Sequence, residues 1–518
     1  MLIKNVGGSS LKSTRGIGIG ISYLNTALNM ICGLFLSSFL IRILGDQEYG
    51  LYQTISAFAT YLVLLEFGTG TVMSRNISVC RANGKNEDID RNISTVWFIT
   101  LALSFIIVIV SGVFYFSIDP LYQNTMSADQ IIYAKKIFVL VTVYLIFSFL
   151  TQTLNGALLG YEQYVFAEGL KCIKHILRTS LLVAIIFFER YSIFIALVDM
   201  ILSIAIFIAT LCYCKKRYNI KFEIRKFDKH ILVEALPFCL ALMIQSLVNQ
   251  ANNNVDKFVI GIIISMESVA IYSVSQYIYS IFSSVTTVPI SMYLPQVAKH
   301  LGEGKRGREF TDTLIEPCRL VVFVGGAILF GFFAVGQQFI KIVYGANYTS
   351  AWIYALIIMI PMFINMTNGV LVNALDVLKK RTVRSCILLM TTVLNVILTV
   401  VLIKRIGIIG AVIATAIATF LGQVLIMNIY YDKKLGIKVM RLFVKSYKGI
   451  IPIYIAASVI GYFASKLISN VYLSFIVGGI IFVGLSVVLL PLFGFDPSEK
   501  KKAKSLLIKV KQKIFART

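Results

Sequence analysis

The stretch "FLIRILGDQEYGLYQTISAFATY", residues 39–61, indicates the fold because it places a short polar corner between two long apolar runs. Within it, Gly45 and Gly50 bracket Asp46 and Glu48. Glycine lets the backbone turn tightly, and charged side chains are stable where a loop reaches water. The stretch therefore predicts a hairpin of two apolar helices joined by a corner at the membrane surface.

The composition of the whole chain indicates an all-α polytopic membrane protein. Of its 518 residues, 58% are hydrophobic and 14% are charged, whereas soluble domains are about 45–50% apolar and about 25% charged. Since one helical crossing of a bilayer needs about 20 apolar residues, the apolar runs predict about 14 transmembrane helices. The expected spans are 17–41, 51–72, 93–117, 132–158, 165–188, 192–214, 236–263, 269–295, 318–343, 351–375, 385–403, 406–431, 447–468 and 471–494.

The distribution of positive charge predicts the orientation of these spans. Most of the 49 Lys and Arg residues fall in alternate loops and in the two termini. Such loops remain in the cytoplasm, so both termini are expected there and the corner at 42–50 is expected outside. The net charge of +24 then lies along one membrane face, beside anionic lipids rather than nucleic acid. The tail at 498–518 has apolar residues at helical spacing among lysines, which is typical of an amphipathic interfacial helix.

The polar corner occurs a second time. In "KFVIGIIISMESVAIYSVSQYIYS", residues 257–280, Tyr272 aligns with Tyr52 and Ala270 with Gly50. The two copies are separated by an even number of spans, so the sequence predicts two six-helix lobes in parallel repeat. The expected domains are a first lobe (17–214), a basic linker (215–230), a second lobe (231–431), two extra spans (447–494) and the basic tail.

The sequence carries no signature of an enzyme, a metal site or a cofactor site. The run "GIGIG" at 16–20 lacks the preceding strand and following acid of a dinucleotide-binding loop. The three histidines are far apart, and the eight scattered cysteines are interpreted as reduced packing residues. The outward loops are short, which argues against an external catalytic domain. We expect a protein that is not an enzyme and that binds no metal.

Several spans carry polar residues at helical spacing on one face. Such a stripe forms either interhelical hydrogen bonds or the wall of a wet cavity. Because the stripes recur at matching places in both lobes, a shared cavity is the favoured interpretation. The expected cavity-lining residues are Asn25, Asn29, Gln53, Gln152, Asn155, Gln245, Asn249, Asn252, Gln276, Tyr279, Asn365 and Asn395.

The fifth expected span contains a row of cations. Lys171, Lys174, His175 and Arg178 follow the spacing that places them on one helix face. A cation at the bilayer centre costs at least ~2.5 kcal/mol, so this face should not point at lipid. The favoured hypothesis is a phosphate-binding wall, since Arg offers a planar fork and Lys a point charge. The alternative is snorkelling toward the interface, with Glu168 paired to one of the lysines.

Two intramembrane acids are candidates for coupling to an ion. Asp256 lies on the polar stripe of the seventh span beside Lys257, and Glu66 ends the second span. A carboxylate inside a membrane could carry a proton or bind a sodium ion. The alternative role for Asp256 is structural pairing with Lys257 or another cation.

Four segments resemble a known family. These are "ILGDQEYGLY" (43–52), "LLEFGTGTVMSR" (64–75), "DKFVIG" (256–261) and "IGIIGAVIATAIATFLGQV" (406–424). They are similar to the oligosaccharide-flippase branch of the multidrug/oligosaccharidyl-lipid/polysaccharide exporter superfamily. The chain departs from that pattern at Glu66, where the family commonly has Asp, and at Ala270, which replaces a glycine.

The resemblance implies a function. Members of this family flip undecaprenyl-pyrophosphate-linked oligosaccharides from the cytoplasmic to the outer leaflet of the bacterial cytoplasmic membrane by alternating access. The family places its cavity on spans one, two, four, five, seven, eight, ten and eleven. Polysaccharide polymerase and chain-length proteins are expected partners. The alternatives are a peptidoglycan-precursor (lipid II) flippase, a cation-coupled multidrug antiporter and a non-transporting scaffold of a polysaccharide assembly complex.

Overall fold

The computed structural model describes residues 8–500, except residues 60, 63–65, 67, 84–85, 219, 221, 379–380 and 498. Most side chains between 8 and 23 and between 232 and 253 lie outside this description, as does the expected tail beyond Lys500. The described chain is helical almost throughout and contains no strand. The predicted all-α fold is therefore confirmed.

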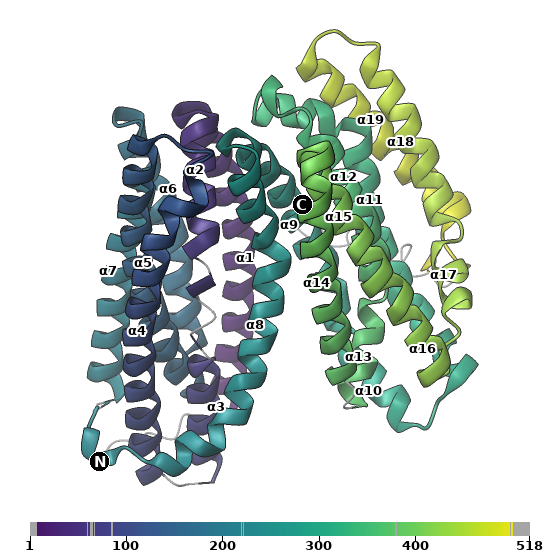
Figure 1. Ribbon diagram of the computed structural model, residues 1–518. Helices are drawn as coiled ribbons and strands as arrows, with labels where there is room; N and C mark the ends of the chain where they lie inside the picture. The colour runs from purple at the N-terminus through teal and green to yellow at the C-terminus, as the bar shows by residue number, and fades with distance from the viewer. Residues whose placement is uncertain are drawn as a thin grey trace, which may run out of the picture. The chain divides into compact units, whose positions relative to one another are not determined.

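The chain divides into two compact units, Met1–Ser273 and Val274–Thr518. In the first unit, α4, α5 and α7 run side by side (Figure 1). Its helices are α1 (Gly8–Leu44), α2 (Asp46–Ala59), α3 (Thr69–Ala82), α4 (Asn86–Tyr122), α5 (Ala128–Gly160), α6 (Tyr164–Phe188), α7 (Ile193–Tyr218), the 3-10 helix η2 (Ile224–Lys226), α8 (Lys229–Ile263) and the beginning of α9 (Met266–Met292). The expected lobes follow the sequence repeat, whereas the unit boundary follows the packing of α8 against α2 and α4.

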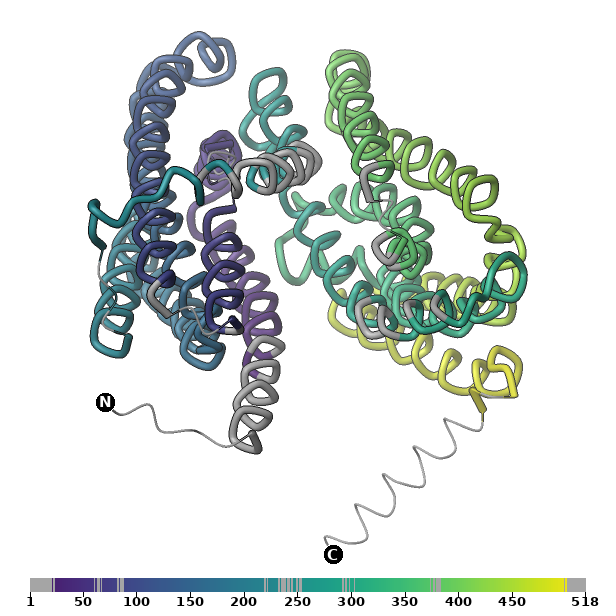
Figure 2. Tube along the Cα trace, turned by 90° about the horizontal axis from the view of Figure 1, so that it is seen from below, coloured from purple at the N-terminus to yellow at the C-terminus, as the bar shows by residue number. Residues whose placement is uncertain are grey.

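In the second unit, α18 and α19 pack together beside the long helix α11 (Figures 1 and 2). Its helices, after the remainder of α9, are α10 (Leu294–Gly302), α11 (Gly307–Val343), the 3-10 helix η3 (Ala346–Tyr348), α12 (Ala351–Thr367), α13 (Gly369–Val377), α14 (Arg381–Ile406), α15 (Ile408–Thr419), the π-helix η4 (Phe420–Ile426), α16 (Met427–Leu435), α17 (Val439–Tyr447), α18 (Ile450–Lys466), α19 (Val471–Leu489) and the π-helix η5 (Leu490–Gly494). The two extra spans expected at 447–494 thus pack onto α11.

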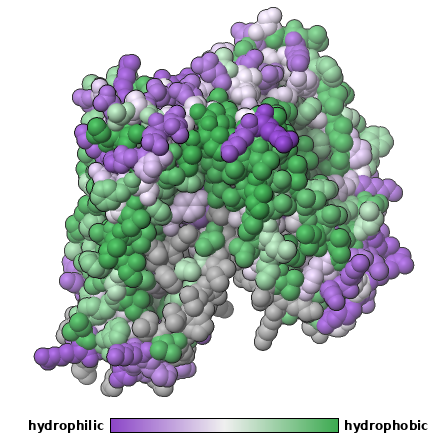
Figure 3. Space-filling model, viewed as in Figure 1, coloured by the Kyte–Doolittle hydropathy of each residue, from purple (hydrophilic) through white to green (hydrophobic). Residues whose placement is uncertain are grey.

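The length and apolarity of the helices identify a multi-pass membrane protein. Among the described residues, 9 helices are long and apolar enough to cross a membrane, or 10 if the bent pair α17 and α18 forms one span. Hydrophobic side chains cover the flanks of the helices, and hydrophilic ones gather at their ends (Figure 3). α6 fails the test because Lys171, Lys174 and Arg178 interrupt its apolar sequence. The second expected span, 51–72, is interrupted between α2 and α3.

The predicted corner between the first two spans is present, and one of its acids has a structural partner. Gly45 has φ 82°, a left-handed conformation that favours glycine. Asp46 and Glu48 lie in the first turn of α2, where negative charge stabilises the helix dipole. Glu48 does not simply face water, because it accepts hydrogen bonds from the Ser192 backbone N–H (3.1 Å) and hydroxyl (2.6 Å). The corner therefore also anchors the start of α7.

The two copies of the corner motif touch each other. Gly50 is buried, and a methyl group there would lie 1.9 Å from the backbone oxygen of Met266, at the start of α9. We expect Gly50→Ala to lower the free energy of unfolding by about 1–3 kcal/mol, because backbone must move to admit the methyl group. Thermal unfolding of the purified protein in detergent measures this loss. Gly112→Ala in α4, where nothing lies within 4 Å, is the control; equal losses would refute the close approach.

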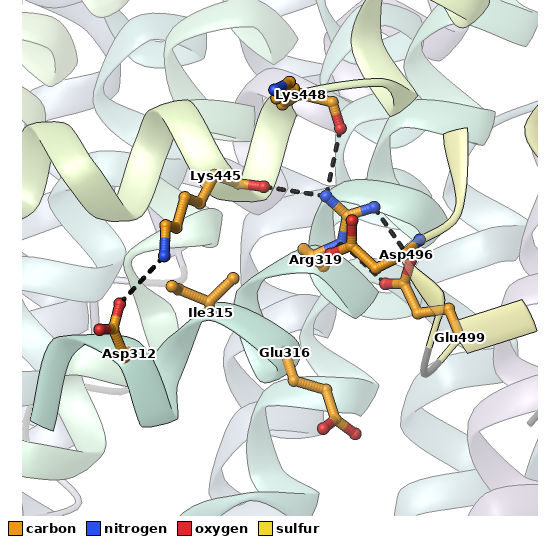
Figure 4. Close-up of a pocket in the computed structure, with 8 residues that line it drawn as sticks. All are labelled: Asp312, Ile315, Glu316, Arg319, Lys445, Lys448, Asp496 and Glu499. Atoms are coloured by element: carbon orange, nitrogen blue, oxygen red, sulfur yellow. Dashed lines mark hydrogen bonds and ion pairs between the residues drawn. The ribbon is translucent and has the colours of Figure 1, made fainter. Parts of the chain in front are cut away.

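A buried arginine holds the last described residues of the second unit (Figure 4). Arg319 of α11 has a side chain that is only 3% exposed. It donates hydrogen bonds to the backbone oxygens of Lys445 (2.8 Å), Lys448 (3.1 Å) and Gly494 (2.8 Å). Its other donors contact both carboxylate oxygens of Glu499, at 2.8 and 2.9 Å. Arg319 therefore joins α11 to the ends of α17 and η5 and to the first residues of the basic tail.

Candidate functional site

The first unit contains a polar pocket of about 390 Å³. It lies among α1, α2, α5, α6 and α7, and its lining residues are Asn29, Tyr52, Ser56, Val141, Tyr144, Leu145, Lys171, Lys174, His175, Arg178 and Asp199. The four members of the predicted cationic face thus line one pocket. Because α6 carries them at positions one turn apart, a single helix face supplies the positive charge of the site.

A smaller polar cavity of about 130 Å³ shares two lysines with this pocket. Both cavities are lined by Lys171 and Lys174, and the smaller one adds the predicted residues Gln152 and Asn155 of α5. Among the described residues, the side-chain oxygen of Asn155 is buried and has no hydrogen-bond partner. A buried carbonyl without a partner is unfavourable unless a ligand or water binds it. The amide-rich cavity can therefore accept hydroxyl groups next to the cations.

Arg178 is paired with an aspartate that the polar stripes did not reveal. Its Nε and Nη2 atoms donate to the two carboxylate oxygens of Asp199 in α7, at 2.5 and 2.8 Å. The hydroxyl of Tyr52 in α2 donates to the same carboxylate at 3.2 Å. The side chain of Arg178 is 28% exposed and that of Asp199 is 10% exposed. This partly buried pair joins α6 to α7 at the wall of the pocket.

Lys171 also has an acidic partner. Its Nζ atom lies 2.6 Å from a carboxylate oxygen of Glu168, one turn earlier on α6. Asn25 of α1 donates to the other oxygen of Glu168 at 3.2 Å. The alternative raised by the sequence, an acid on α6 that pairs with one of its lysines, is therefore correct for Lys171.

Lys174 is the lysine of the pocket without an acidic partner among the described residues. Its Nζ atom lies 5.3 Å from the centre of the Tyr144 ring in α5. A cation over an aromatic face is attracted by the ring, but its charge is not neutralised. Because the charges of Lys171 and Arg178 are balanced by Glu168 and Asp199, Lys174 supplies the unbalanced positive charge of the pocket.

The sequence carries a signal for Asp199 that is separate from the polar stripes. Asp199 is the lone charged residue of the expected span 192–214. An isolated acid in an apolar span is itself a mark of function or of a buried partner. The resemblance left the sixth span out of the cavity, whereas α7 contributes Asp199 to one cavity and Ser203 to the other.

Two predicted cavity residues of the first unit, Asn25 and Gln53, are not part of the lining of either cavity. Asn25 donates a hydrogen bond to Glu168 at 3.2 Å. Gln53 donates to the hydroxyl of Tyr49 at 2.9 Å. The side chains of Gln245, Asn249 and Asn252 lie outside the described part of the chain.

In the second unit, two predicted residues make hydrogen bonds between helices. Asn365 of α12 donates to Gln423 of η4 at 2.8 Å. Asn395 of α14 is buried and accepts from Thr415 of α15 at 3.3 Å. These contacts match the alternative interpretation of the stripes as interhelical hydrogen bonds. Gln276 and Tyr279 are half-buried on α9 and line neither cavity of the first unit.

Both corner motifs place a tyrosine against a buried aspartate. Tyr272, which aligns with Tyr52, donates its hydroxyl to Asp256 at 2.5 Å, and Asp256 is 1% exposed. Tyr52 makes the equivalent contact with Asp199. The hydroxyl of Tyr272 thus satisfies one carboxylate oxygen of Asp256. Glu66, the other coupling candidate, is half-buried between α2 and α3. Among the described residues, no three His, Cys, Asp or Glu side chains converge as a metal site would require.

A protein family described as "Polysaccharide biosynthesis protein" matches residues 39–353, more than half of the chain. The chain belongs to this family. Two solved structures of other proteins have the same fold as this chain. One is "Lipid II flippase MurJ, inward closed conformation", with a TM-score of 0.66 and 17% identity over 90% of this chain and 98% of that one.

A second structure of the same fold is an inward-facing multidrug resistance MATE family transporter of the MOP superfamily. It has a TM-score of 0.61 and 16% identity, and the match covers 83% of this chain and 98% of that one. At such identities the likeness shows the fold alone. A comparison with curated proteins finds no match.

Proposed function

We propose that this polysaccharide biosynthesis protein is a flippase for a polyprenyl-pyrophosphate-linked oligosaccharide, which it moves from the cytoplasmic to the outer leaflet by alternating access. The observation that carries the proposal is the pocket of the first unit, where an unbalanced lysine lies beside an amide-lined cavity. Phosphate needs cationic donors, and sugar hydroxyls need amide and hydroxyl partners. The pocket offers both on neighbouring walls.

We assign one part of the cargo to the cationic pocket and another part to the amide-lined cavity. Lys174 and the neighbouring Arg178 would bind the pyrophosphate, with Lys as a point charge and Arg as a planar donor. Gln152 and Asn155 would receive sugar hydroxyls in the adjoining cavity. The polyprenyl chain would stay in lipid, where its apolar carbons are stable. This division matches a substrate with a charged centre between a polar and an apolar end.

A lipid II flippase is the closest alternative, because its substrate presents the same pyrophosphate with a different sugar. A cation-coupled multidrug antiporter would need an acidic or aromatic cavity, which the row of cations on α6 disfavours. Native mass spectrometry of the purified protein can compare three ligands: a polyprenyl-pyrophosphate oligosaccharide, lipid II and a lipophilic cation. We expect the first to bind best. Preferential binding of the lipophilic cation would contradict the proposal.

The proposal extends to the setting of the protein. We propose a site in the bacterial cytoplasmic membrane with both termini in the cytoplasm, anionic lipids along the basic face, and polysaccharide polymerase and chain-length proteins as partners. The flippase would perform no chemistry on its cargo. A scaffold without transport activity can be distinguished from a flippase, because substitutions in the pocket would leave polysaccharide export by a scaffold unchanged.

Asp256 is the better candidate for ion coupling, because it is more deeply buried than Glu66. We expect Asp256→Asn to bind lipid-linked sugar but to lose the response of transport to an imposed proton or sodium gradient. The substitution keeps size and hydrogen bonding but removes the charge. Flipping in vesicles with and without each gradient measures the response. Normal stimulation would reassign Asp256 to structural bonding and move attention to Glu66→Gln.

A further inference from the structure

Helix α6 is joined to α5 and α7 by a small number of side-chain contacts. It packs chiefly against α1 and has smaller contacts with α5 and α7. Near its start, the ring of Phe166 stacks on Tyr213 of α7 with centroids 3.7 Å apart. In its middle, Lys174 reaches the Tyr144 ring of α5 and Arg178 reaches Asp199 of α7. Two of the pocket cations, Lys174 and Arg178, therefore also tie the middle of α6 to its neighbours.

The Arg178–Asp199 pair has a geometry that permits exchange. Asp199 occupies one edge of the guanidinium, through Nε and Nη2. The Nη1 atom makes no hydrogen bond to a described residue, and both side chains line the pocket. A phosphate in the pocket can therefore contact Arg178 before Asp199 leaves. Tyr52 remains as a donor to Asp199 after Arg178 has moved.

The charged headgroup of an anionic lipid bound to Lys174 would lie within reach of Arg178. The two residues are four positions apart on α6, so their Cβ atoms are about 5–6 Å apart on one helix face. A diphosphate can span this distance, and a guanidinium binds phosphate oxygens in the same two-point manner as a carboxylate. The bound phosphate would contact two cations, whereas Asp199 contacts one.

We propose that Arg178 and Asp199 form a latch between α6 and α7, which a diphosphate-bearing lipid opens by taking Arg178 from Asp199. The inference rests on the proposed function and adds a specificity step to it. An uncharged lipid of the same chain length cannot compete for the guanidinium, so it leaves α6 attached to α7. Asp199 is then a positioning residue that holds the empty transporter in one state until anionic cargo arrives.

The test measures the separation of α6 and α7 in the full-length protein. Spin labels replace the exposed residues Leu181 and Ile201 after the native cysteines are removed, and pulsed electron paramagnetic resonance gives their distance. Geranylgeranyl diphosphate is the probe, and geranylgeraniol is the uncharged control. In the wild-type protein we expect the diphosphate to lengthen the distance and the alcohol to leave it unchanged.

Two variants separate the latch from simple binding. Asp199→Asn should show the long distance without any probe and should bind the diphosphate at least about tenfold more tightly, since its internal competitor is gone. Glu168→Gln is the matched control, because it removes the other acid paired to a pocket cation without breaking a contact between α6 and α7. It should keep the short distance.

Tyr52→Phe provides a gentler variant if Asp199→Asn folds poorly. It removes only the hydroxyl that donates a hydrogen bond to Asp199 after Arg178 has left. Several-fold more diphosphate should then be needed to lengthen the distance between α6 and α7. A diphosphate that binds the wild-type protein without changing the distance would overturn the latch and leave the proposed function standing. A diphosphate that does not bind at all would overturn the proposed function. An unchanged distance in well-folded Asp199→Asn would also overturn the latch.

Discussion

Lys174→Ala is expected to reduce the transport of lipid-linked oligosaccharide by about ten- to a hundredfold at equal protein abundance. Lys174 supplies the unbalanced charge of the pocket, and a hydrogen bond to a charged group contributes about 1.5–3 kcal/mol. The substitution breaks no ion pair among the described residues, where Lys174 lies over the Tyr144 ring. Folding should therefore be preserved while transport falls. Export of polysaccharide in cells and flipping in reconstituted vesicles both measure the effect.

The controls for Lys174 follow from the pairing of its neighbours. Lys174→Arg keeps the charge and should retain part of the activity. Lys404→Ala removes an exposed lysine outside the pocket and should leave transport unchanged. Arg178→Ala should reduce transport as well, but it leaves Asp199 without its main partner, so we expect a lower folded yield too. Normal transport by Lys174→Ala would contradict the hypothesis that the cationic face of α6 binds the phosphate of the cargo.

Arg319→Ala is expected to be the most destabilising single substitution that we describe. The side chain is 3% exposed, donates to three backbone oxygens and pairs with the carboxylates of Glu499 and Asp496. The substitution leaves the three backbone oxygens without their shared donor, and each hydrogen bond lost from a charged donor costs about 1.5–3 kcal/mol. The carboxylate of Glu499, which is 22% exposed, can turn to water instead. The loss should appear as a lower thermal unfolding temperature and as release of the C-terminal helices to protease. Both can be measured on protein purified in detergent.

Arg441→Ala is the matched control for Arg319. Arg441 also binds a carboxylate of α11 in a two-point contact, to Asp312 at 2.8 and 3.0 Å. That pair is exposed, and exposed pairs contribute little to stability. Arg441→Ala should therefore unfold close to the wild-type temperature. If the two arginine variants lose equal stability, Arg319 does not hold α17 and η5 against α11 in the way the structure indicates.

Much of the fold was predictable because apolar runs and corners are local features of the sequence. The hairpin at Gly45 and the helical class follow from composition and turn residues. The packing of α8 with the first unit was not predictable, since it depends on contacts with α2 and α4 rather than on the repeat. The same holds for the contact of Gly50 with Met266, which joins two distant copies of a motif.

The site was predictable where one helix carries it and not where helices meet. The cationic face of α6 follows from spacing alone, and the structure places all four residues in one pocket. The balance of charge did not follow, because Asp199 reaches Arg178 from another helix. For the same reason the stripes could not show that Asn365 has Gln423 as its partner. Periodicity identifies a face of a helix, but it does not identify what that face meets.

We propose that this protein carries a pyrophosphate-linked oligosaccharide across the membrane through the pocket of Lys174. The most direct measurement is flipping of a fluorescent polyprenyl-pyrophosphate oligosaccharide in vesicles that contain only the purified protein. A reductant outside the vesicles quenches the label in the outer leaflet and so reports translocation. We expect rapid translocation by the wild-type protein and little by Lys174→Ala. Equal translocation by both proteins, or by empty vesicles and the wild-type protein, would contradict this proposal.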